Sequence, residues 1–248
     1  DDHMSHISSL SSEVDPDYAE AVGRLPEHLY RFVSVDGARL NWLRRLLLDH
    51  EMYFPSPSTF NDPLDCAIPP VFTGSKLAIE LGWRESLRKD EPALDKKTRN
   101  RMAKARAAES VSFEGQRKIA AKLRSLLNKW GVACFTPDPT NFLLWSYYAA
   151  GHTGVGVRFN CKQPTMERLL DSVKHQGSKL FVVDVEYRDA FPVVDWLRDS
   201  DFLNLRAILA TKSSAWRHEN EWRITLLNKT GYVKIPSDFV DGVILGMC

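Results

Sequence analysis

Residues 76–130 constrain the fold most, because they are rich in the helix-forming residues Lys, Arg and Ala. Short runs of apolar, aromatic and β-branched residues stand on both sides of this segment. Such runs are typical of strands, whereas periodic stretches of the length seen in residues 76–130 are typical of helices. The sequence therefore predicts an α+β fold in which a helical insertion, broken around Glu91-Pro92, interrupts a β scaffold.

The strands outside the insertion are expected to be short and to alternate with amphipathic helices. The expected strands are 29–33, 51–54, 131–136, 155–159, 180–187, 222–226, 232–235 and 243–245. The expected helices begin after Asp36 and Asn141, which can act as N-caps, and cover 164–174 and 195–211. This pattern predicts one domain over residues 24–248, with a mixed or split antiparallel-rich sheet and flanking helices.

The N-terminal segment is expected to lie outside the fold. Asp1-Asp2-His3 precedes Met4 as an expression scar would, and the stretch that follows to Gly23 lacks the apolar periodicity of a packed element. The chain shows neither an apolar run long enough to span a bilayer nor a secretory signal, so we expect a cytoplasmic protein without a membrane partner.

The cysteines form no C-x-x-C pair, and no histidine stands at zinc-ligand spacing, so no metal site is expected. The apolar run around Cys134 predicts that this thiol is a buried core residue. The four cysteines are Cys66, Cys134, Cys161 and Cys248.

Charge is distributed unevenly along the chain. Residues 84–130 hold fourteen Lys and Arg against six Asp and Glu, which leaves a small negative balance elsewhere. A basic stripe on helices can meet nucleic acid or an acidic partner. The plainer interpretation is a solvated helical face, because acidic residues are interspersed and aromatic residues are few.

Three segments place polar groups where a core element would not need them, and such segments usually share a site. The first is Tyr30-Arg31, with Asn61-Asp62-Pro63 thirty residues later. The second is 145–154, which runs from a helix end through a turn bounded by glycines into a strand. The third is 212–223, which holds six ionisable side chains.

Together these blocks resemble the bacterial family catalogued as domain of unknown function 2971. The resemblance rests on an aromatic-basic pair, a Ser-Pro and Phe-Asn-Asp-Pro loop, a Trp-x-x-Tyr…His-x-Gly block and a Lys…Trp-x-x-Glu-x-Glu-Trp-Arg block, and it covers the chain from about Leu29 to the end. Here the blocks are Tyr30-Arg31, Ser56-Pro57 with Phe60-Asn61-Asp62-Pro63, Trp145/Tyr148/His152/Gly154 and Lys212/Trp216/Glu219/Glu221/Trp222/Arg223. The long basic segment before Gly131 departs from the family's pattern.

The order of these blocks is also similar to that of ADP-ribosyltransferases, which carry a basic residue on an early strand and a catalytic glutamate on a late one. That similarity implies an enzyme that uses NAD to modify a macromolecule, protein or nucleic acid, in a setting of bacterial toxins or phage defence. Arg31 would grip the pyrophosphate. The implied cofactor-binding residues are Tyr30, Arg31, Trp145, Tyr148 and His152, and the implied catalytic residues are Glu221 and Glu219.

Period-two geometry on a strand would send Glu219 and Glu221 to the same side and Asn220 and Trp222 to the other. Glu221 would then stabilise the developing cation and Glu219 would orient the acceptor. The plainer interpretation is an ion network with Arg217 or Arg223.

Two other classes of function stay open from the sequence. A nuclease or hydrolase would use His152, Lys212 and Glu219 as acid-base groups without NAD. A non-catalytic module would bind nucleic acid or a protein through its basic helices. Asn61 and Asp62 are expected to form a turn and to be structural in either case.

Overall fold

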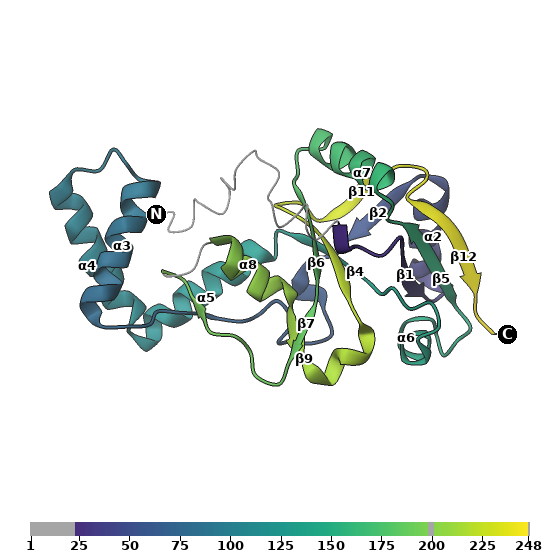
Figure 1. The fold of residues 1–248 in the computed structure, drawn as a ribbon, viewed down its shortest axis with the longest axis horizontal. Coiled ribbons are helices and arrows are strands. Elements are labelled where there is room, and N and C mark those ends of the chain that lie inside the picture. The colour runs from purple at the N-terminus through teal and green to yellow at the C-terminus, as the bar shows by residue number, and fades with distance from the viewer. Residues whose placement is uncertain (1–22, 198–200, 248) are drawn as a thin grey trace.

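The structure is a computed structural model that describes residues 23–197 and 201–247. These residues form an α+β fold rich in antiparallel strands, as the sequence predicts (Figure 1). The predictions for the N-terminal segment fall almost wholly outside the described residues.

Two three-stranded antiparallel sheets form the scaffold. The first has the order β1-β5-β12, from β1 (His28–Val33), β5 (Val155–Asn160) and β12 (Val240–Leu245). The second has the order β4-β10-β6, from β4 (Gly131–Phe135), β10 (Trp222–Leu226) and β6 (Leu180–Asp184). The two sheets meet where Tyr30 bridges Thr136, so β1 and the end of β4 lie side by side.

Shorter ladders complete the β structure. An antiparallel pair joins β2 (Glu51–Phe54) to β11 (Gly231–Lys234). Two parallel pairs join β3 (Pro70–Val71) to β8 (Val194–Asp195) and β7 (Glu186–Arg188) to β9 (Thr211–Ser213).

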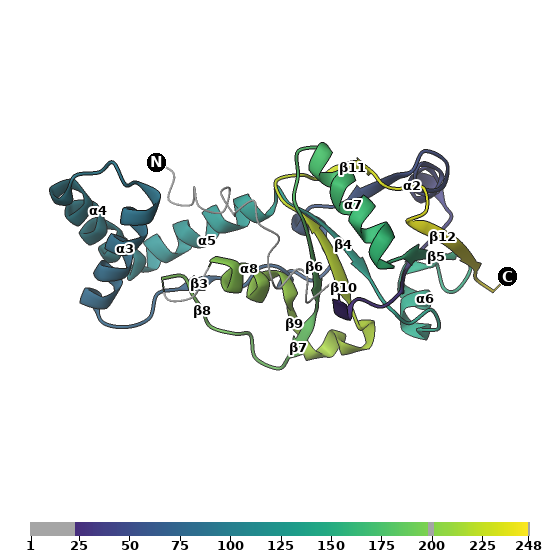
Figure 2. The same cartoon turned by 45° about the horizontal axis from the view of Figure 1, so that its top comes forward.

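The largest apolar core lies between the two sheets and the helices α2 (Gly37–Leu48) and α7 (Gln163–His175). The buried residues of α7 recur at Met166, Leu169 and Val173, which is the spacing of one helical face. Figure 2 shows α7 lying along β6 and β11. Phe159 on β5 is central to this core, because its ring contacts Phe135 from the other sheet and Phe239.

The predicted insertion consists of α3 (Lys76–Asp90), α4 (Lys96–Ser110) and α5 (Phe113–Leu127). The side chains of Ser75, Asp95 and Ser112 cap the three helices, and the break falls at Glu91 as expected. In Figure 1, α3 and α4 form the end of the molecule opposite to the C-terminus, and α5 leads back to the sheets. The α3–α4 pair has its own small core, made of Ile79, Trp83, Leu87, Ala103 and Ala107.

The sequence prediction fails in two places. The expected strand 180–187 divides into β6 and β7, and the expected helix 195–211 shortens to α8 (Asp201–Ala210) between β8 and β9. Both segments hold continuous apolar runs, and periodicity alone cannot divide such runs into separate elements. The remaining helices are η2 (Pro57–Thr59), α6 (Phe142–Tyr148) and η3 (Ser214–Glu219). Within the described residues, no helix combines the length and apolar character that a bilayer crossing requires.

Truncation of the central aromatic residue should weaken the fold. We expect Phe159→Ala to lower the free energy of unfolding by about 3–5 kcal/mol, because the ring is fully buried and its loss leaves a cavity. Phe113→Ala is the control, since this ring is 83% exposed, and should change stability by less than about 0.5 kcal/mol. Urea unfolding measures both, and equal effects would contradict the assignment of the core.

Candidate functional site

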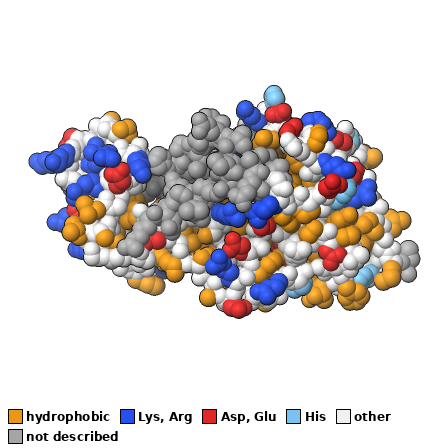
Figure 3. All heavy atoms as spheres, in the orientation of Figure 1, with side chains coloured by type: hydrophobic (Ala, Val, Ile, Leu, Met, Phe, Trp, Pro, Cys, Tyr) orange, Lys and Arg blue, Asp and Glu red, His pale blue; other side chains and the backbone are white. Residues whose placement is uncertain are grey.

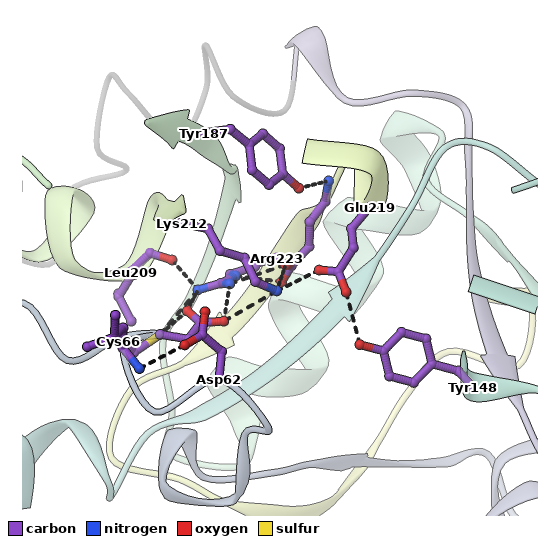
Figure 4. A network of polar contacts seen from close by, with 11 residues as sticks. Asp62, Cys66, Tyr148, Tyr187, Leu209, Lys212, Glu219 and Arg223 are labelled. Carbon is purple, nitrogen blue, oxygen red and sulfur yellow. Dashed lines mark hydrogen bonds and ion pairs between the residues drawn. The ribbon is translucent and has the colours of Figure 1, made fainter. Parts of the chain in front are cut away.

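A buried arginine organises the polar centre of the molecule. Arg223 lies in the middle strand of the β4-β10-β6 sheet, and its side chain is fully buried. Its Nη1 and Nη2 donate to Oδ1 and Oδ2 of Asp65, each at 2.8 Å, and its Nε donates to Oε1 of Glu221 at 2.6 Å (Figure 4). Nη1 also donates to the carbonyl of Leu209 at 2.7 Å. The guanidinium therefore joins β10 to the loop before β3 and to the end of α8.

Lys212 on β9 is the second buried cation of the cluster. Its Nζ lies 2.5 Å from Oε2 of Glu219, 3.2 Å from Oε2 of Glu221 and 3.6 Å from Oδ2 of Asp65. Burial alone would lower the pKa of Lys212, but Glu221, Glu219 and Asp65 outweigh it and raise that pKa above its usual value. The ammonium is therefore held in its charged form.

We call these five side chains the charge cluster: Asp65, Lys212, Glu219, Glu221 and Arg223. It contains three carboxylates and two cations, so its ionised form carries one excess negative charge. Burial alone would raise the pKa of Glu221, but Arg223 and Lys212 outweigh it and hold that pKa well below its usual range.

Two tyrosines hydrogen-bond to the charge cluster from neighbouring elements. The hydroxyl of Tyr148, at the end of α6, donates to Oε1 of Glu219 at 2.9 Å. The hydroxyl of Tyr187 on β7 accepts the backbone N–H of Glu221 at 2.8 Å. Figure 4 shows the two rings approaching the cluster from different sides. Burial raises the pKa of both phenols, and the nearby carboxylates act in the same direction, so both stay protonated at neutral pH.

The prediction that both glutamates lie on one strand is wrong. Glu219 ends the 3₁₀ helix η3, Asn220 adopts left-handed backbone angles (φ 45°, ψ 57°), and Glu221 directly precedes β10. The expected period-two alternation does not apply here, because a left-handed residue breaks the extended backbone. The two carboxylates nevertheless meet, since both contact Lys212.

A cavity of about 820 Å³ opens beside the charge cluster. It lies between β1, the start of α2, the end of β4 and the loop after β2, with α6 at one side. Aromatic side chains line much of it, among them Tyr30, Trp42, Phe60, Tyr147 and Tyr148. Asp65, Lys212, Glu219 and Glu221 of the charge cluster also line it.

Arg31 contributes a cation to the cavity wall from β1. Its Nη1 atom is buried and has no hydrogen-bond partner among the described residues. Its guanidinium carbon lies 5.2 Å from the centre of the Trp42 ring. Burial lowers the pKa of Arg31, and the neighbouring Cys134 acts in the opposite direction. Arg31 therefore offers the cavity a partly desolvated donor, unlike Arg223, whose donors are occupied.

Five of the seven site residues named from the sequence line this one cavity, although they are far apart in the chain: Tyr30, Arg31, Tyr148, Glu219 and Glu221. The structure does not bring Trp145 or His152 to its walls. The Trp145 ring packs 4.7 Å from Phe32 and donates its Nε1 to the Pro139 carbonyl. The His152 ring lies 3.0 Å from the Ser146 hydroxyl through Nε2. The proposed ligand contacts of these two side chains have no geometric support.

The loop before β3 is closer to the site than the sequence indicated. Asp62 is structural, since its Oδ1 accepts the N–H of Leu64 in a turn. Asn61, expected to be structural too, lines the cavity, and its side chain interacts with the Tyr148 hydroxyl. Asp65 escaped the sequence analysis altogether. The available signal was Arg223 within an apolar strand, because a buried cation requires a carboxylate partner.

Cys134 also differs from the prediction of a buried core thiol. It is half-buried and lines the cavity, where burial raises its pKa well above the usual range and Glu221 adds to the effect. This thiol is therefore held protonated and is not suited to act as a nucleophile. Over the described ranges, no group of three or more His, Cys, Asp or Glu side chains is placed to hold a metal ion.

Comparison with known proteins gives one match. Residues 144–224 match the model of a family described as "Protein of unknown function (DUF2971)", which supports the resemblance drawn from the sequence. The matched segment runs from α6 to β10 and includes Tyr148, Lys212 and both glutamates, but not Arg31. No curated protein and no solved structure matches the chain. The similarity to ADP-ribosyltransferases gains nothing from these comparisons and stays a prediction.

Removal of Asp65 should destabilise the protein strongly. We expect Asp65→Ala to lower the free energy of unfolding by about 3–5 kcal/mol, because it leaves the buried Arg223 guanidinium short of two acceptors. Glu186→Ala is the matched control: it breaks the exposed pair with Arg188 and should cost less than about 1 kcal/mol. Chemical denaturation of both variants decides, and a similar loss in each would show that the buried cluster contributes little.

Stability should also fall in acid. Because the pKa of Glu221 is depressed in the native state, its contribution is fully present above the unfolded value of about 4.3 and is lost as pH falls towards about 2. The urea midpoint should therefore decrease from pH 5 to pH 2. Glu221→Gln should flatten this decrease, whereas the exposed Glu186→Gln should leave it unchanged. A decrease identical in all three proteins would contradict the native-state ionisation of Glu221.

Proposed function

We propose that the cavity binds NAD as a co-substrate and that the protein is an ADP-ribosyltransferase-like enzyme that modifies a macromolecule. The observation that carries this proposal is the pairing of opposite charges in one cavity. Arg31 offers an unpaired donor, and the charge cluster offers an excess carboxylate. A ligand that satisfies both must carry an anionic group and a cationic one.

NAD has these features, since its pyrophosphate is anionic and its nicotinamide ring is cationic. The Arg31 guanidinium suits the pyrophosphate, because arginine donors bind phosphate oxygens in a charge-assisted manner. A volume of about 820 Å³ falls in the range of sites for small ligands. The rings of Tyr30 and Tyr148 provide faces against which an aromatic base or nicotinamide can stack.

The reaction itself needs little covalent chemistry from the protein. The bond from ribose C1′ to the nicotinamide nitrogen breaks, and the nitrogen keeps the electron pair while positive charge develops on the ribose. A nucleophile of the acceptor then forms the new bond at C1′ and releases a proton. A carboxylate that stays ionised stabilises such a cation, and the depressed pKa of Glu221 supports this role.

Glu219 suits contact with the acceptor. It lies on the side of the cluster nearer to solvent, because its partner Tyr148 is 40% exposed whereas the partner of Glu221, Arg223, is fully buried. A hydrolase or nuclease that employs Lys212 and His152 has less support. Lys212 is held as a cation by three carboxylates, and His152 does not line the cavity.

Replacement of Arg31 tests the ligand. We expect Arg31→Gln to weaken NAD binding in calorimetry at least tenfold while the melting temperature stays unchanged, because Nη1 makes no hydrogen bond within the described part of the protein. Arg158→Gln is the control, since Arg158 lies opposite Tyr30 on β5 but pairs with the exposed Asp241. Equal NAD binding by both variants and the parent would remove Arg31 from the site.

Turnover tests the glutamates. The parent protein should release nicotinamide from NAD, Glu221→Gln should abolish this release, and Glu219→Gln should reduce transfer to an acceptor more than hydrolysis of NAD. Circular dichroism checks that each variant is folded. If the parent releases no nicotinamide with candidate acceptors present, and Glu221→Gln only lowers the melting temperature, the charge cluster is structural and the enzymatic proposal fails.

A further inference from the structure

The exposed face of α4 differs from the other helices of the insertion in how its charges are satisfied. On α3 and α5, arginines form ion pairs with glutamates one turn away, as in Arg84–Glu80, Arg88–Glu85 and Arg117–Glu114. The α4 helix carries six Lys and Arg but one acidic residue, Glu109. Its own charges therefore cannot be neutralised within the helix.

The unneutralised charges gather on one stripe. Lys97, Arg101 and Lys104 are exposed and recur at four- and three-residue spacing, which places them on a single face of α4. Within the described residues, none of these three side chains forms an ion pair or hydrogen bond. We call these three residues the α4 stripe. Figure 3 shows Lys and Arg side chains gathered at the end of the molecule formed by α3 and α4.

The helix beneath the stripe is firmly held. Ala103 and Ala107 on its opposite face pack fully buried against Ile79, Trp83 and Leu87 of α3, and Ser110 accepts a hydrogen bond from the Trp83 indole. The buried face is accordingly occupied by α3, and the exposed face presents cations from a packed helix.

We propose that the α4 stripe binds the phosphate backbone of nucleic acid. Three adjacent unpaired cations on a packed helix suit a ligand with regularly repeated negative charge, and contacts to phosphates supply most of the non-specific affinity for nucleic acid. The stripe has no large apolar residue among its members, whereas protein interfaces centre on buried aromatic and apolar anchors. Insertion into a membrane surface needs an apolar face, and α3 covers the apolar face of α4. This inference does not depend on the proposed enzymatic activity.

Binding without sequence preference and with strong salt dependence should follow. Each phosphate contact contributes about −0.9 to the slope of log affinity against log salt concentration, so the stripe should contribute a slope of about −3. The probes are a fluorescent 20-base-pair DNA duplex and an RNA duplex of the same sequence, titrated with the full chain by anisotropy at several salt concentrations.

The decisive variant is Lys97→Gln/Arg101→Gln/Lys104→Gln. Its matched control, Arg88→Gln/Arg117→Gln/Arg188→Gln, removes the same charge from exposed arginines that have ion-pair partners. We expect the stripe variant to bind at least tenfold more weakly with a flatter salt dependence, and the control to change affinity less than threefold. Circular dichroism and melting temperature confirm that both variants are folded.

Three results would overturn the inference. The first is the absence of binding to either duplex by the parent protein at low salt. The second is an equal loss of affinity in the two triple variants, which would show that net charge alone attracts the duplex. The third is tighter binding of the parent to poly-glutamate or to phosphatidylserine vesicles than to both duplexes, which would make the partner an acidic protein or a membrane.

Discussion

The buried guanidinium of Arg223 is the interaction on which the centre of this structure depends. A charge in the middle strand of a sheet would oppose folding if it had no partner, because the cost of taking it out of water is several kcal/mol. Asp65, Glu221 and the Leu209 carbonyl satisfy it from three separate segments. Each of these segments must therefore reach its native place before the strand can be buried. The cavity walls are built largely from the same segments.

The sequence was sufficient for much of the secondary structure, because local signals determine it. The caps at Asn141, the helical face of 164–174 and the apolar runs at 131–135 and 222–226 all lie where they were expected. The 3₁₀ turn at Ser214–Glu219 was missed, since short irregular helices lack the apolar periodicity on which such predictions rely.

The site could be predicted only in part. Polarity beyond the needs of a core singled out Arg31, Tyr148 and the two glutamates, and these residues line one cavity. The same criterion also selected Trp145 and His152, whose polar atoms are satisfied by neighbours within α6 and its adjoining loops. Asp65 could not be found locally, because its partner stands 158 residues later in the chain. Long-range pairing of this kind is a property of the fold and not of any window of sequence.

The left-handed backbone at Asn220 also limits how this part of the chain can change over evolution. Asparagine, aspartate and glycine tolerate such a conformation, whereas a β-branched residue would be strained there. A deletion or insertion between the two glutamates would also alter the bend that lets both reach Lys212. Any homologue that keeps this geometry is therefore restricted to a few small or flexible residues between its two carboxylates, even though that middle side chain is exposed to solvent and takes no part in the charge cluster.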